Sequence, residues 1–160
     1  DCTWNIFTIP KCSFISWLAL KDRLLTRDKM ILRQMHTDPH RLFCSNLESI
    51  HHLFSDCPFF DLIRKACPIE FCSNWATCQD GQIFAASIDR KLHLIGSLYL
   101  TVAVYITYKK RNFRVHHSGS THTIHSIIVN LKTIAREKLF TCRTFRKWMR
   151  DDPTLICLLY

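Results

Sequence analysis

The sequence predicts a mostly α-helical protein, and three observations support this prediction. Hydrophobic residues make up 48% of the 160 residues, which is enough to build a core. The chain has only 3 glycines and 5 prolines, whereas a sandwich or barrel with many tight turns needs more of both. Apolar residues also recur every three to four positions through much of the chain, which is the period of an amphipathic helix.

Two helices are predicted before residue 40. Apolar residues at three-to-four spacing indicate an amphipathic helix over residues 11–25. Thr26 is placed to cap a second helix, and Pro39 ends it because the residue before a proline is disfavoured in helical geometry. The buried face of this second helix is predicted to hold Met30, Ile31 and Met35.

Two more helices are predicted between residues 49 and 66. Ser49 is placed to cap the first of them. Pro58 suits the first turn of the other, which is predicted to run to Ala66. Residues 67–82 show no clear period, so we predict an irregular connection there.

The second half of the chain is predicted to form long helices. Residues 84–112 follow a helical pattern around an uncharged stretch from Leu92 to Tyr108. Because this stretch is shorter than the ~20 residues that span a bilayer, we predict a buried core helix and no membrane association. Thr121 or Thr123 is placed to cap a last helix that continues to Arg150. Its apolar stripe is predicted to be core: Ile124, Ile127, Ile128, Leu131, Ile134, Ala135 and Leu139.

The charge of the chain is concentrated in one segment. The formal net charge is +9, and residues 105–150 hold 11 Lys and Arg against one acidic residue. We expect a small domain over residues 1–79 and a helical, basic segment over residues 80–160. Such segregation points to RNA or DNA before a membrane surface, and the alternative is a solvated basic face that binds nothing. The predicted phosphate contacts are Lys109, Lys110, Arg111, Arg114, Arg143, Arg146, Lys147 and Arg150, with Phe113 and Trp148 available to stack on unpaired bases.

Three soft or borderline metal ligands fall within a short stretch of the first half. Cys44, His52 and Cys57 are residue types that zinc prefers, supplied by a loop and by the start of a helix. The alternative is that both cysteines are small buried side chains and His52 is hydrogen-bonded near the surface. The chain has 9 cysteines at irregular spacing and no signal peptide, so we expect a reducing, intracellular location.

An ordered series of short motifs surrounds these three residues. In order, it consists of Trp4, Pro10-Lys11, Phe14, Trp17-Leu18, Arg23-Leu24-Leu25-Thr26, Cys44, Glu48-Ser49, His52-Leu53-Phe54 and Cys57-Pro58. The series resembles the zinc-binding domain that follows the reverse transcriptase in plant LINE-type, non-LTR retrotransposons. A second similarity to that family covers Val104 to Asn112. The resemblance implies a helical zinc-knuckle domain, zinc as cofactor, a role beside nucleic acid and the nucleus as one candidate compartment.

One position departs from that family's metal site. Arg41 stands where the first knuckle cysteine belongs, and a guanidinium cannot bind zinc. His40 or His51 is then the candidate fourth ligand, and His40 has an acceptable spacing before Cys44. The resemblance therefore implies a degenerate site held by Cys44, His52, Cys57 and His40.

The sequence carries no motif of an enzyme. Asp151-Asp152 is the one pair of adjacent aspartates, and it stands beside a proline without the hairpin motif of a polymerase. No phosphate-binding loop or nucleophile motif is present, and no local motif supports a cysteine nucleophile. We therefore predict a non-catalytic fragment that binds zinc and RNA or DNA, with no small-molecule substrate. The alternative is a helical protein-interaction module without metal or nucleic acid.

Overall fold

The computed structural model describes residues 3–35, 47–116 and 123–160. This part of the chain is helical and contains no β-strand, which confirms the predicted fold class. Its elements are α1 (Pro10–Leu20), α2 (Arg27–Leu32), the π-helical turn η1 (His52–Asp56), α3 (Pro58–Lys65), α4 (Trp75–Gln79), α5 (Arg90–His116), α6 (Ile124–Thr141), α7 (Arg143–Asp151) and the 3-10 helix η2 (Pro153–Leu159).

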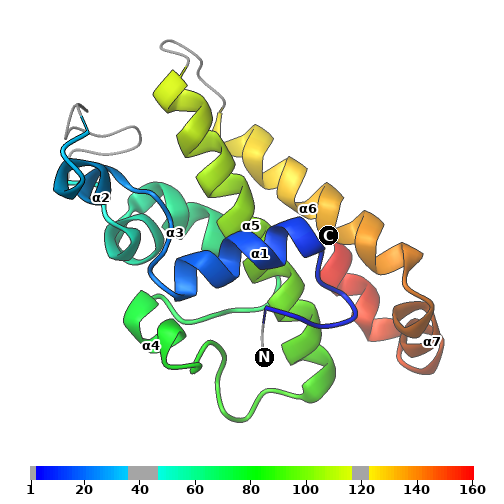
Figure 1. Ribbon diagram of the computed structural model, residues 1–160. Helices are drawn as coiled ribbons and strands as arrows, with labels where there is room; N and C mark the ends of the chain where they lie inside the picture. The colour runs from blue at the N-terminus through cyan, green and yellow to red at the C-terminus, as the bar shows by residue number, and fades with distance from the viewer. Residues whose placement is uncertain (1–2, 36–46, 117–122) are drawn as a thin grey trace.

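Helix α5 lies at the centre of the fold, where α1 packs across it and α6 runs alongside it (Figure 1). Every residue from Ile95 to Val104 is buried, as expected for a helix that is apolar around its whole circumference. Gly96 lets Phe84 pack closely, because a Cβ at this position would lie 2.6 Å from the Phe84 ring. The predicted core helix is confirmed, although it begins at Arg90 and not at residue 84. Within the described ranges, no helix is long and apolar enough to cross a membrane.

Helix α6 is amphipathic and begins at the predicted cap. The Thr123 side-chain oxygen accepts a hydrogen bond from the Ser126 backbone N–H at 3.3 Å. The predicted apolar stripe faces the core, and its most buried members are Ile127, Leu131, Ala135 and Leu139.

The predicted last helix is broken in two, which corrects the expectation of one helix to Arg150. Cys142 has an extended backbone with φ −81° and ψ 119°, and it separates α6 from α7. An unbroken helix would carry the apolar stripe from Leu139 toward Arg146. The break instead buries Phe145 completely and leaves Arg146 exposed.

The helices of the first half are shorter than predicted. Helix α1 ends at Leu20, and Asp22 just beyond it adopts a left-handed φ of 53°. Helix α2 ends at Leu32, before Gln34 with φ 57°, so Met35 does not continue its face. The predicted buried face of this helix is therefore wrong, since Ile31 and Met35 are both exposed.

The structure confirms the predicted cap at Ser49 and adds a short helix within the predicted irregular connection. Ser49 is the predicted cap, and its hydroxyl accepts a hydrogen bond from the His52 backbone N–H at 3.0 Å. The predicted connection contains the short helix α4, which is capped by the Asn74 side chain. Trp75 on α4 is buried beside Phe54, with 4.7 Å between the ring centroids.

The two predicted parts of the chain share one hydrophobic core. Phe7 is buried among residues of the second part, with its ring centroid 6.3 Å from that of Phe145 and 5.2 Å from that of Trp148. Helix α1 also packs on α5, and α3 packs on both α5 and α6. Side chains on both sides of the boundary between residues 79 and 80 therefore stabilise the same core, and a separate domain at that boundary stays a prediction.

Candidate functional site

Two of the predicted zinc ligands lie on consecutive elements of the first half. His52 begins η1 and is 8% exposed, while Cys57 directly precedes α3 and is 1% exposed. The Cys57 backbone N–H donates to the His52 carbonyl oxygen at 2.9 Å, which closes the turn between them.

The other predicted ligands, Cys44 and His40, lie outside the described residues, as does Arg41. Within the described ranges, no group of three or more His, Cys, Asp or Glu side chains is arranged to hold a metal ion. The His52 imidazole and the Cys57 thiol are both buried and are ligand types that zinc prefers, so their chemistry suits zinc binding. Convergence of all four ligands stays a prediction.

A buried ion pair takes Arg111 out of the predicted phosphate contacts. Arg111 Nε donates to the Glu48 carboxylate at 2.9 Å and 3.1 Å, and the two side chains are only 5% and 6% exposed. The Arg111 Nη1 group also donates to the Asn112 side-chain oxygen at 2.9 Å. The arginine is thus held inside the fold by a carboxylate, and an external phosphate cannot reach it.

The remaining basic residues near the end of α5 form a small cluster of like charges. Lys109 is exposed, whereas Lys110 and Arg114 are half-buried. Partial burial and the neighbouring charges of Lys109 and Arg114 lower the pKa of Lys110. The Arg114 guanidinium lies 5.6 Å from the centroid of the Phe59 ring, so part of its surface covers an aromatic side chain.

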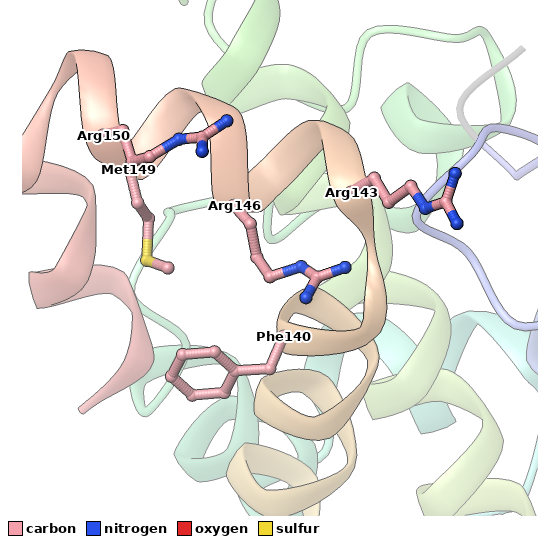
Figure 2. A pocket seen from close by; sticks show the side chains of 5 residues that line it. All are labelled: Phe140, Arg143, Arg146, Met149 and Arg150. Atoms are coloured by element: carbon pink, nitrogen blue, oxygen red, sulfur yellow. The ribbon is translucent and has the colours of Figure 1, made fainter.

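The basic residues of α7 are all exposed and line an open groove. Arg143, Arg146 and Arg150 share one face of the helix, because they are spaced at i, i+3 and i+7. The groove has a volume of about 590 Å³ and is completed by Phe140 and Met149. Figure 2 shows Met149 extending toward the Phe140 ring, while the guanidinium groups of Arg146 and Arg143 point away from it.

These three arginines have no carboxylate partner in the part of the chain that the structure describes. The described salt bridges involve other cations: Lys29, His51, Arg64, Lys65 and Arg111. Lys147, on the same helix, is likewise exposed and outside these ion pairs. The surface of α7 therefore carries an excess of positive charge, four Lys and Arg against Asp151, which attracts an anion.

The predicted phosphate contacts fall into two groups at opposite ends of α6 (Figure 1). One group precedes α6 at the end of α5, and the other follows it on α7. The 18 residues of α6 span roughly 27 Å at the usual rise of an α-helix. A single phosphate group cannot contact both groups, although an extended strand is long enough to do so.

The structure also changes which aromatic residues are available for stacking. Trp148, one of the two predicted, packs against the buried Phe7 ring. Phe140, which the sequence did not single out, is 41% exposed in the arginine groove. The sequence could have indicated that Phe140 is exposed, because this residue follows Leu139 but does not belong to the apolar stripe of α6.

Comparison with known proteins bears on the first half of the chain. Residues 1–63 match the family model described as zinc-binding in reverse transcriptase. The matched range includes Cys44, His52 and Cys57, and it ends within α3. No curated protein and no solved structure gives a significant match to the chain. The predicted resemblance to a zinc-binding region associated with reverse transcriptases is therefore confirmed for residues 1–63.

Proposed function

We propose that this protein is a non-catalytic module that binds RNA or DNA through the groove on α7. The observation that carries the proposal is the row of Arg143, Arg146 and Arg150, exposed and without acidic partners in the described ranges. Guanidinium groups bind phosphate with paired hydrogen bonds, so such a row suits the backbone of a nucleic acid. The proposed module has no small-molecule substrate.

The match of residues 1–63 supports this proposal from the other end of the chain. A zinc-binding region associated with a reverse transcriptase works beside a polymerase that holds RNA and DNA. We further propose that the chain is a degenerate relative of the plant LINE-type regions that it resembles. An intracellular protein is expected from this role, and the nucleus is one candidate compartment.

We also propose that zinc is held by Cys44, His52 and Cys57, with His40 in place of the ligand missing at Arg41. The burial of His52 and Cys57 supports this assignment, because a structural zinc site is closed to solvent. When bound, zinc supplies a structural crosslink. The chain's own contribution is the turn of η1, which begins at His52 and is followed directly by Cys57, the residue before α3.

The test of nucleic-acid binding is fluorescence anisotropy with labelled single-stranded RNA and DNA over a range of salt concentrations. We expect binding that weakens steeply with salt, because phosphate contacts release counterions. Replacing Arg143, Arg146 and Arg150 together by Ala should reduce the slope of log affinity against log salt by about 2, since each phosphate contact with a single strand contributes about 0.7.

A matched control removes the same charge elsewhere. Lys21, Arg23 and Arg33 are exposed cations of the first half, and their triple Ala variant should keep the salt slope of the unchanged protein. No binding at low salt, or an equal loss in both variants, would overturn the proposal. Retention of a protein partner at high salt without nucleic-acid binding would support the interaction module instead.

A further inference from the structure

We propose that the groove on α7 receives an unpaired nucleotide, with its base against the Phe140 ring and its phosphates on Arg146 and Arg150. This inference rests on the proposed nucleic-acid binding and adds to it a preference for single strands. Three observations in the groove lead to it: an exposed ring, the placement of the guanidinium groups and the size of the space.

The exposed Phe140 ring is the feature that phosphate binding alone does not explain. The side chain is 41% exposed although it follows Leu139, which is fully buried. Met149 faces it from α7, so an apolar surface lies among three cations (Figure 2). A nucleobase has an apolar face that stacks on aromatic side chains, and its phosphates remain at the charged rim.

The arginines are placed around that apolar surface. Arg146 and Arg150 are separated by about one helical turn, roughly 6 Å along the axis. Arg146 lines the groove with its guanidinium group turned away from the Phe140 ring, so it is available to contact the phosphate attached to a base on that ring. The volume of about 590 Å³ lies within the ~300–1,000 Å³ that small-ligand sites occupy, which is enough for one nucleotide.

The geometry favours a single strand over a duplex. In a duplex, neighbouring base pairs cover the faces of the bases, so none of them can lie flat on Phe140 without being flipped out. An acidic peptide would satisfy the arginines but would leave the ring without a stacking partner. The chemistry of the groove therefore fits an unpaired, phosphate-linked base.

The test compares three labelled ligands of equal length: single-stranded RNA, an abasic strand with the same phosphates, and an RNA duplex. We expect the single strand to bind most tightly. Phe140→Ala should weaken single-strand binding by about 5- to 150-fold and leave abasic binding unchanged, because only stacking is lost. Phe140→Tyr should retain the affinity. Phe14→Ala on α1 removes an exposed phenylalanine outside the groove and should have no effect.

A second measurement places the base directly. A strand that carries one 5-iodouracil is irradiated in the complex, and crosslinked peptides are identified by mass spectrometry. We expect the crosslink on the peptide that contains Phe140. The inference would be overturned if Phe140→Ala weakened abasic and single-strand binding equally, or if the crosslink lay elsewhere. It would also be overturned if the duplex, or polyglutamate tested as an acidic peptide, bound more tightly than the single strand. If Phe140→Ala has no effect while the triple arginine variant loses its salt slope, the proposed function stands and the nucleotide site does not.

Discussion

Glu48 and Arg111 lie 63 positions apart in the sequence and form a buried ion pair between the loop before η1 and helix α5. Arg111 Nε donates to both carboxylate oxygens, and the backbone N–H of Arg27 donates to the same carboxylate at 3.0 Å. One side chain thus connects the start of α2, the segment that precedes η1 and the end of α5. The match to the zinc-binding family ends at residue 63, so this contact joins matched and unmatched parts.

Loss of one partner of this ion pair should destabilise the protein strongly. We expect Arg111→Met to lower the free energy of unfolding by about 3–5 kcal/mol, because it leaves the Glu48 carboxylate buried without a counter-charge. Urea denaturation measures the change. The double variant Glu48→Gln, Arg111→Met should be more stable than the sum of the single changes predicts. Lys109→Met, at an exposed neighbouring site, is the control, and a loss below about 1 kcal/mol for Arg111→Met would contradict the prediction.

The matched region by itself should not fold. Phe7 is completely buried, and its ring contacts Phe145 and Trp148 of α7. A fragment of residues 1–63 would expose this ring and the surfaces of α1 and α3 that pack on α5. We expect circular dichroism to show no cooperative thermal transition for the fragment, even with zinc added, whereas the full chain should show one.

The same contact can be tested in the full chain. Phe145→Ala should lower the free energy of unfolding by about 3–5 kcal/mol, because Phe145 has no exposed surface. A cooperative transition of the 1–63 fragment, together with a small effect of Phe145→Ala, would show that the first half is autonomous.

Restoring a cysteine at position 41 should strengthen zinc binding. We expect Arg41→Cys to raise the zinc content of the purified protein, measured by elemental mass spectrometry, and to raise its melting temperature. The reason is that a third thiolate, beside those of Cys44 and Cys57, replaces a cation that repels zinc. Cys57→Ser should lower the zinc content, and Cys157→Ser, at an exposed cysteine far along the chain, should not. An Arg41→Cys variant with no additional metal would argue against the assigned ligands.

The protein should lose stability in alkaline solution. Burial raises the pKa of Cys12 to about 11 and that of Cys67 to about 12, from an ordinary value of 9.0. Above about pH 9 the unfolded chain releases these protons while the folded chain retains them, so the free energy of unfolding falls as the pH rises toward the folded pKa values. Urea midpoints measured from about pH 8 to pH 11 test this direction.

Variants of single cysteines identify the groups responsible for that pH dependence. Cys67→Ala should weaken the dependence, because the thiol that donates to the Ile63 carbonyl oxygen at 3.4 Å is removed. Cys157→Ala, at an exposed site, should leave the dependence unchanged. An identical pH dependence in Cys67→Ala and the unchanged protein would contradict the assignment to this thiol.

Local patterns in the sequence were sufficient to predict several elements. The core helix around Leu98, the cap at Thr123 and the cap at Ser49 each depend on residues within one or two helical turns. Such features need only near neighbours, because backbone hydrogen bonds and apolar periodicity act locally. The break at Cys142 was not predicted, since it follows from the burial of Phe145 against a residue near the start of the chain.

The candidate sites show the same division. The charge composition alone indicated a basic surface, because an excess of Lys and Arg can be counted without knowing which residues contact each other. The tertiary structure decided that Arg111 is buried against Glu48, that the remaining cations form two separated groups, and that Phe140 stands exposed among arginines. Each of these outcomes depends on how helices pack across long separations in the chain. Residue type and spacing determined the charge and most of the helices. Packing between distant segments determined where the last helix breaks and which charged and aromatic side chains remain free to meet a ligand.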